Sequence, residues 1–147
     1  MKPSIEQTAL RLLARREHSA QELRRKLHDK GYPGNEVDAL LERLARDKLL
    51  SDERFMESFI HVRTAKGHGP LLIRAELEAR GVARTLIADA IAVSAPHWRE
   101  AARRVRHKRF GAAPRDQRER VRQMRFLQQR GFTAEQISAA FKSDDTD

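Results

Sequence analysis

The sequence predicts an all-α protein made of three tandem three-helix repeats of about 50 residues, which together form an elongated, curved body. Three observations lead to this fold class. One helix ending recurs at a fixed interval, apolar residues recur with a helical period between the endings, and no segment shows the alternation that is typical of strands. The expected repeats are residues 1–50, 51–95 and 96–143, followed by a short acidic tail at residues 144–147.

The repeated helix ending consists of a leucine, two variable residues, a base, a glycine and an apolar residue. It occurs as Leu27–Tyr32, Leu77–Val82 and Leu127–Phe132. The glycine suits the left-handed conformation that closes a helix, the base lies at the negative end of the helix dipole, and the leucine packs on the apolar residue. We interpret Gly81 as a hinge marker, so that Gly81→Val should lower stability and alter curvature.

Four further positions of the repeat carry an apolar residue in all three copies. They are Ile5, Phe55 and Val105; Leu10, Ile60 and Phe110; Val37, Ile87 and Ile137; and Leu41, Ile91 and Phe141. These positions argue against a chance spacing of the glycines, because the period lies in the range of known helical arrays.

The first repeat is expected to contain three helices. A capping box, in which a serine is followed three residues later by Gln or Glu, opens the first two helices at Ser4 and Ser19. The second helix ends at Gly31, and the third extends to about Leu49.

The second repeat is expected to begin with a helix that Ser51 or Asp52 caps. Pro70 can occupy the first turn of its second helix, where a missing N–H costs nothing. The third helix is predicted over residues 85–93.

The third repeat is expected to start after Pro96, with Trp98 on the buried face of its first helix. Its second helix is predicted to bury Val121, Met124 and Leu127. Its last helix starts at Thr133 with another capping box, and the chain should fray from Lys142 onward.

The composition favours thin cores and wet helix faces over a large enzyme core, since 39% of the 147 residues are hydrophobic and 35% are charged. Cysteine is absent, which excludes disulfides and thiolate chemistry. The sequence shows no signal-peptide core and no apolar run of membrane-spanning length. We therefore expect a soluble, cytoplasmic, monomeric protein without membrane contact.

No residue pattern indicates catalysis, a metal site or a cofactor. The six histidines are scattered without an H-x-x-x-H pair, so we expect structural or solvated roles for them. Gly67-His68-Gly69 lacks the Walker pattern of a phosphate loop and is interpreted as a turn. Asp52 and Glu53 are adjacent and point apart on a helix, which favours compensation of the helix dipole over acid–base chemistry. The protein is therefore not expected to be an enzyme.

The charge of the chain predicts polyanionic partners, because the net charge is +9 and the pI is about 10.7. Between Arg99 and Arg125, eleven bases face three acids, too few to pair them. The arginines that we expect to bind phosphates are Arg99, Arg103 and Arg106 on one helix, Arg115, Arg118, Arg122 and Arg125 on the next, and Arg24 and Arg25 in the first repeat.

The expected mode is contact with the backbones of single- and double-stranded DNA without strong sequence reading, since aromatic residues make up only 5% of the chain. If about five bases met single-strand phosphates, the slope of log affinity against log salt would be near −3.5. A helix-turn-helix reader is a less favoured alternative, because the helix over residues 34–49 would then turn Glu36, Asp38 and Glu42 toward phosphates.

The sequence resembles the RecX family of bacterial regulators of the RecA recombinase. The resemblance is carried by Arg16–Ser19, Glu22-Leu23, Lys30–Tyr32, Leu49–Phe55, Arg63, Lys66–Pro70, Ile73–Leu77 and Arg80–Val82. It covers most of residues 9–91, whereas the third repeat matches weakly, so the roles of the third repeat's arginines are inferred from the residues alone. Three departures from the family's usual residues, Ser51, Met56 and Phe59, are mild changes of cap or core.

The resemblance implies three tandem three-helix repeats, in agreement with the period found independently. It also implies a non-enzymatic inhibitor that binds RecA–DNA filaments, along with DNA, and restrains filament growth, ATP hydrolysis and strand exchange. Two alternatives remain open at this point: a general DNA-binding helical module that does not read sequence, and a helical scaffold whose arginines meet acidic proteins.

Overall fold

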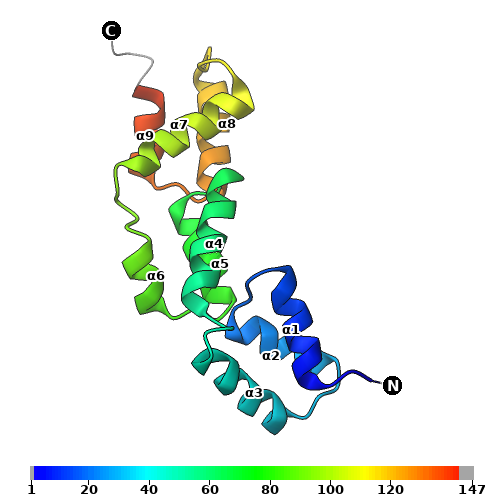
Figure 1. Cartoon of the computed structure of the whole chain (residues 1–147). Helices are drawn as coiled ribbons and strands as arrows, with labels where there is room; N and C mark the ends of the chain where they lie inside the picture. The colour runs from blue at the N-terminus through cyan, green and yellow to red at the C-terminus, as the bar shows by residue number, and fades with distance from the viewer. Residues whose placement is uncertain (1, 143–147) are drawn as a thin grey trace. The chain divides into compact units, whose positions relative to one another are not determined.

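The computed structural model describes residues 2–142, and within that range the chain forms nine α-helices and no strand. Three successive groups of three helices follow one another along the chain (Figure 1). The helices are α1 Ile5–Arg15, α2 Ala20–Asp29, α3 Gly34–Arg46, α4 Asp52–Ala65, α5 Pro70–Ala79, α6 Arg84–Ala90, α7 His97–Phe110, α8 Gln117–Gln129 and α9 Ala134–Lys142. The predicted all-α class is confirmed, while the predicted acidic tail lies outside the described residues.

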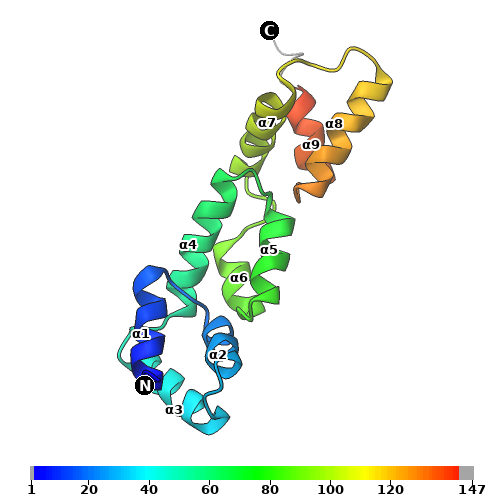
Figure 2. The ribbon, with the colours of Figure 1, turned by 90° about the vertical axis from the view of Figure 1, so that its right-hand side faces the viewer.

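The described residues pack as two compact units, and each is considered by itself. The N-terminal unit comprises residues 2–59 and 77–87, and the C-terminal unit comprises residues 60–76 and 88–142. In the N-terminal unit, α1, α2 and α3 enclose a leucine-rich core that includes Leu23, Leu27 and Leu44. In the C-terminal unit, α7, α8 and α9 lie side by side (Figure 2).

The three repeated glycines close their helices as predicted. Gly31, Gly81 and Gly131 have φ angles of 92°, 84° and 95°, in the left-handed region. In each copy the residue after the glycine donates its N–H to the carbonyl of the leucine that opens the motif, at 3.2 or 3.3 Å. All three leucines are fully buried. The glycine N–H also donates within the motif, to the carbonyl of the residue after the leucine, at 2.9 or 3.0 Å, so two local hydrogen bonds hold each helix ending.

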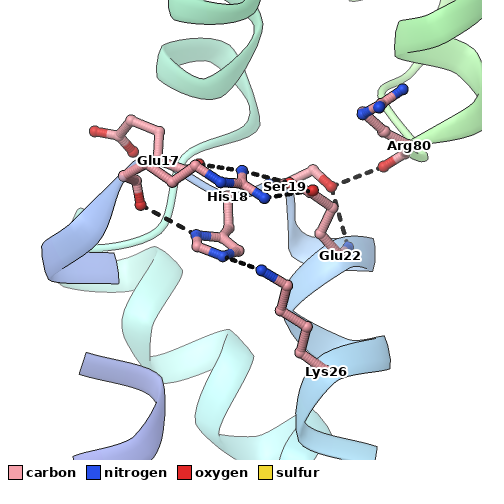
Figure 3. Close-up of polar contacts among 7 residues, drawn as sticks. Glu17, His18, Ser19, Glu22, Lys26 and Arg80 are labelled. Atoms are coloured by element: carbon pink, nitrogen blue, oxygen red, sulfur yellow. Dashed lines mark hydrogen bonds and ion pairs between the residues drawn. The ribbon is translucent and has the colours of Figure 1, made fainter. Parts of the chain in front are cut away.

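Two of these glycines have a second role, which the sequence alone does not reveal. In the N-terminal unit, the start of α2 meets the end of α5, where the Ser19 hydroxyl donates to the Arg80 carbonyl at 2.7 Å (Figure 3). A Cβ atom added to Gly81 would lie 2.6 Å from the Cβ of Gln21. Glycine is therefore needed at position 81 for two reasons: its φ angle is positive, and the joint leaves little room for a Cβ atom.

The same joint recurs fifty residues later in the C-terminal unit, where the start of α5 meets the end of α8. The N–H of Gly69 donates to the Arg130 carbonyl at 2.6 Å, and the N–H of Leu71 donates to the Gly131 carbonyl at 2.9 Å. A Cβ atom added to Gly131 would lie 2.5 Å from the backbone nitrogen of Leu72. We call the contact between the start of one middle helix and the end of the next the head-to-tail joint. Gly31 takes part in no such joint, since a Cβ atom added there would meet only the end of the Lys2 side chain, at 3.4 Å.

A polar network holds the first of these joints in place (Figure 3). The Arg16 guanidinium donates two hydrogen bonds to the Glu22 carboxylate, at 3.0 and 3.2 Å, and the N–H of Ser19 donates to the same carboxylate. Burial alone would raise the pKa of Glu22, but the hydrogen bonds from Arg16 and Ser19 outweigh it and hold that pKa below its usual value. The segment Arg16–Ser19 is therefore part of a structural joint.

His18, like Ser19, is a buried member of this network. The Lys26 ammonium can only donate, so Nε2 of His18 accepts from it at 2.9 Å, and Nδ1 donates to the Arg16 carbonyl at 3.0 Å. Burial lowers the pKa of His18 below its usual 6.5, the hydrogen bond to the carbonyl opposes this, and the charges of Arg16 and Lys26 lower the pKa further. The ring is held neutral.

The stability of the N-terminal unit should therefore fall as the pH is lowered through the region below 6.5. Since the folded-state pKa of His18 lies below the unfolded value, the unfolded chain binds the proton more readily, and the contribution is complete above pH 6.5. The expected slope is at most about 1.4 kcal/mol per pH unit. Thermal unfolding between pH 7.5 and 5.5 measures it; His18→Gln should flatten the dependence, and His28→Gln, at an exposed position, should not. An unchanged pH dependence in His18→Gln would contradict the assignment.

Two helices end earlier than predicted. Helix α3 ends at Arg46 because Lys48 adopts a left-handed conformation, with φ 62°, and closes the helix without glycine. Helix α6 ends at Ala90, and the Val93 carbonyl beyond it accepts a hydrogen bond from the Gln136 side chain at 2.5 Å. The capping boxes at Ser4, Ser19 and Thr133 are all present as predicted, and Ser51 caps α4.

The buried face of α8 was predicted wrongly in part. Met124 is 37% exposed, and Gln123 takes the inward position at 5% exposed, together with the predicted Leu127. Gln123 stands one repeat after the buried Ile73, so position in the repeat, rather than hydrophobicity, decides which residue faces inward. The Gln123 amide donates to the carbonyl of Ala112, in the segment before α8, at 3.4 Å. No helical period predicts this contact.

Candidate nucleic-acid interface

The nine arginines predicted to bind phosphates fall into different environments. Four of them form ion pairs with exposed or partly exposed acids. The pairs are Arg24 with Asp38 at 3.0 Å, Arg99 with Glu135 at 2.5 Å, Arg103 with Glu100 at 2.5 Å and Arg115 with Glu119 at 2.8 Å. Such exposed pairs are weak because water and salt screen them, so a phosphate can displace them, but it must compete. Glu135 belongs to α9, so it was not one of the three acids counted between Arg99 and Arg125.

Arg106 does not lie on the exposed face of α7. It is 4% exposed, and its guanidinium lies 5.2 Å from the centre of the Phe141 ring on α9. Ala102 and Trp98, one and two helical turns earlier, are buried on the same face. The spacing from Arg103 suggested a shared face, but the spacing from Ala102 determines the packing, because α7 turns this side toward α9. Arg106 is therefore not available to an external phosphate.

Three of the predicted arginines lie together on an open surface of the C-terminal unit. Arg118, Arg122 and Arg125 are exposed on α8 and line a hollow of about 710 Å³. Arg109, which comes from α7, lines the same hollow. We call this the basic hollow. Among the described residues none of these four has an acid within ion-pair distance. Arg25 is exposed on α2 and belongs to the N-terminal unit.

A second basic surface lies in the C-terminal unit, between the turn after α4, the middle of α7 and the end of α8. It is a cleft of about 640 Å³, which we call the basic cleft. Its cationic residues are Lys66, Arg104, Lys108, Arg109 and Arg130. No acid of residues 2–142 lines it. Sequence reasoning counted three of these residues within a basic run but did not place Lys66 or Arg130 with them, because only the joint between α5 and α8 brings their segments together.

Arginine side chains in this region lie against phenylalanine rings. Phe110 and Phe126 meet edge to face at 5.4 Å between ring centres. The Arg109 guanidinium lies 5.4 and 5.5 Å from the two ring centres, Arg122 lies 5.8 Å from Phe110, and Arg130 lies 4.9 Å from Phe126. A guanidinium held flat on a ring keeps its N–H edge available to phosphate oxygens. Arg109 lines both the hollow and the cleft, so it joins the two surfaces.

The described residues contain no group of three His, Asp or Glu side chains that could hold a metal ion. His68 is engaged by Glu76, with 2.8 Å between Nδ1 and Oε1, and Arg63 pairs with the same carboxylate at 3.4 Å. Within the part of the chain that the structure describes, no helix is long and apolar enough to span a membrane. What the arrangement can do is bind an anionic polymer.

Comparison with protein families identifies three consecutive matches. The family descriptions are RecX, first three-helix domain, at residues 7–44; RecX, second three-helix domain, at residues 51–91; and RecX, third three-helix domain, at residues 99–141. Unlike the motif resemblance, these matches extend through the third repeat.

Curated relatives match nearly the whole chain. Regulatory protein RecX of Halorhodospira halophila is 46% identical over 98% of this chain and 90% of its own length, and that of Pseudomonas putida strain GB-1 is 43% identical over 98% and 93%. The crystal structure of RecX from Lactobacillus salivarius has a TM-score of 0.81 over 96% of this chain and 94% of its own, at 17% identity, which shows a shared fold.

Proposed function

Because this chain belongs to the RecX family, whose three domains it carries in order, we propose that it is an inhibitor of the RecA recombinase that binds RecA–DNA filaments. In this proposal it restrains filament growth, ATP hydrolysis and strand exchange without catalysis of its own. The observation that carries the proposal is the match of 41–46% identity to proteins named Regulatory protein RecX over nearly the full chain.

The basic hollow supports contact with the DNA of such a filament. Arg118, Arg122 and Arg125 project from successive turns of one helix, and none of them forms an ion pair with a described acid, although Glu119, which is paired with Arg115, also lines the hollow. The phosphates of a nucleic acid strand recur at intervals that such a row of guanidinium groups can follow, and each contact releases a condensed counterion. The mechanism is steric and electrostatic: a protein seated on the filament blocks the addition of a subunit or the path of a strand.

The test is DNA-dependent ATP hydrolysis by the cognate RecA, with and without a substoichiometric amount of this protein. The wild-type protein should inhibit hydrolysis, and a variant with Arg118→Glu, Arg122→Glu and Arg125→Glu should inhibit several-fold less. Absence of inhibition by the wild-type protein would remove RecA as the partner. Full inhibition by the triple variant would leave the partner in place and show that the basic hollow is not the contact.

The two alternative functions give different results in the same assay. A general DNA-binding module would inhibit only at concentrations that coat the DNA, and it would inhibit an unrelated DNA-dependent ATPase equally. A scaffold for acidic proteins would bind RecA, or another acidic protein, equally well without DNA. Inhibition below one protein per several RecA subunits, specific to RecA, favours the proposed regulator.

A further inference from the structure

The basic cleft of the C-terminal unit has a composition that a plain phosphate-binding surface does not need. Its rim carries Lys66, Arg104 and Lys108, all exposed. Its floor is apolar, with Val105 of α7 and Phe126 of α8 among its lining residues. A surface that meets only phosphates has no use for such a floor, because a charged phosphate oxygen gains nothing from an apolar contact and loses hydration there.

The cleft is part of the packed structure. The turn after α4 is seated directly on α7, since a Cβ atom added to Gly67 would lie 3.4 Å from Val105. The opposite wall is held by the joint in which Gly69 donates to the Arg130 carbonyl at 2.6 Å. The cleft therefore exists before any ligand arrives, and its volume of about 640 Å³ lies in the ordinary range of small-molecule pockets.

The charge of the cleft restricts its occupant to an anion. None of its five lysines and arginines has an ion-pair partner among the described residues. Two of them, Arg109 and Arg130, lie with their guanidinium groups over the Phe126 ring, at 5.5 and 4.9 Å. A guanidinium plane is a surface on which a flat ring can stack, and these two belong to residues that line the cleft.

A ligand for this cleft should combine anionic groups, which meet the rim, with a flat ring, which enters the cleft. Single-stranded nucleic acid has this combination, since its bases are unpaired and free to stack on aromatic or guanidinium planes. A duplex keeps its bases inside the helix and offers only phosphates. An acidic peptide offers charge without flat rings of this kind.

We infer that the basic cleft binds a single strand of nucleic acid, with one unpaired base on the cluster of Arg109, Phe126 and Arg130, and with the flanking phosphates on Lys66, Arg104 and Lys108. This inference rests on the proposal that the partner of the basic surface is nucleic acid. It adds a second site with a different preference: the basic hollow takes phosphates of either a strand or a duplex, and the basic cleft requires an unpaired base.

Fluorescence anisotropy with three labelled probes tests the inference: a 20-nucleotide oligothymidylate, an abasic strand with the same number of phosphates, and a duplex of equal length. The cleft variant carries Lys66→Gln, Arg104→Gln and Lys108→Gln. The hollow variant carries Arg118→Gln, Arg122→Gln and Arg125→Gln. A control variant with Arg11→Gln, Arg15→Gln and Arg46→Gln removes the same charge from exposed positions of the first repeat. Circular dichroism checks that each variant is folded.

The wild-type protein should bind the oligothymidylate about tenfold more tightly than the abasic strand. The cleft variant should lose this preference, and the hollow variant should bind all three probes more weakly while keeping it. A wild-type protein that binds both strands equally, or a cleft variant that behaves as the control variant does, would overturn the inference. Polyglutamate that displaces the oligothymidylate as well as unlabelled strand does would identify acidic peptides as the occupant and overturn it too.

The proposed role of the hollow can fail separately, in which case the hollow variant would match the control variant while the cleft variant still loses the base preference.

Discussion

Replacing Gly131 by alanine should lower the free energy of unfolding by about 3 kcal/mol or more, whereas Gly31→Ala should cost only about 1–2 kcal/mol. Both glycines occupy the same position of the repeat and have φ angles of 95° and 92°, so the strain of a left-handed alanine is common to both. The difference lies in what a Cβ atom meets. At Gly131 it would lie 2.5 Å from the backbone nitrogen of Leu72, which cannot move aside as a side chain can.

Two further variants separate the backbone strain from the crowding at the head-to-tail joint. Gly69 has no positive φ, yet its added Cβ would lie 2.6 Å from the carbonyl carbon of Gly131, so Gly69→Ala reports the crowding alone. Gly81→Ala should fall between Gly31→Ala and Gly131→Ala, because its Cβ would meet the Gln21 side chain, which can partly adjust.

Thermal and urea unfolding, followed by circular dichroism, measure this series. A loss of about 1 kcal/mol corresponds to a shift of roughly 2–4 °C in Tm for a chain of this size. If Gly131→Ala and Gly31→Ala were equally destabilised, the role of Gly131 would be confined to ending its helix, and the joint between α5 and α8 would contribute nothing. Gly81 therefore has two roles: it ends α5, and its lack of a side chain allows α2, the middle helix of the preceding repeat, to pack against that end.

Reversing the three arginines of the basic hollow should produce the largest change in DNA binding. With Arg118→Glu, Arg122→Glu and Arg125→Glu, the slope of log affinity against log salt for a single strand should become shallower by about 2, since about 0.7 is lost per phosphate contact. At low salt the affinity should fall by about a hundredfold, because each contact is replaced by repulsion. The physical reason is that none of these guanidinium groups forms an ion pair with a described acid, so a phosphate has no such pair to displace.

Titration of labelled oligonucleotides at a series of salt concentrations gives the slope directly. The matched control carries Arg11→Glu, Arg15→Glu and Arg46→Glu, which change the net charge equally at exposed positions of the first repeat. This control variant should weaken DNA binding only by changing the overall electrostatic potential of the protein. Equal slopes for the two triple variants would mean that net charge alone, and no particular surface, accounts for DNA binding.

The helix endings could be predicted from the sequence because they depend on contacts within six consecutive residues. Leu77, Gly81 and Val82 form one motif whose hydrogen bonds and apolar contact are all local. The end of α3 was missed because Lys48 adopts the left-handed conformation that glycine normally supplies. Nothing in its local sequence signals that choice; after the turn the N–H groups of Leu49 and Leu50 donate to the Leu44 carbonyl, and Leu50 is buried.

The candidate site could be predicted only in outline. A surplus of bases near α7 and α8 is a property of composition, and it pointed to the two helices that line the basic hollow. The separation of free from paired arginines was not predictable, because Arg99 meets Glu135 from a helix that lies far along the chain. The burial of Arg106 over Phe141 was likewise a consequence of how α7 packs on α9.

The sequence by itself determined the fold class, the period of the repeat, the ends of most helices and the membership of a regulatory family, since all of these are recorded in local patterns and in their recurrence. Only the tertiary structure decided which cations face solvent, which are engaged by acids, and which segments form the basic cleft. The physical reason is that Lys66 and Arg130 approach each other through the close contact of Gly69 with the carbonyl of residue 130, a contact between distant segments that no pattern of spacing along the chain specifies.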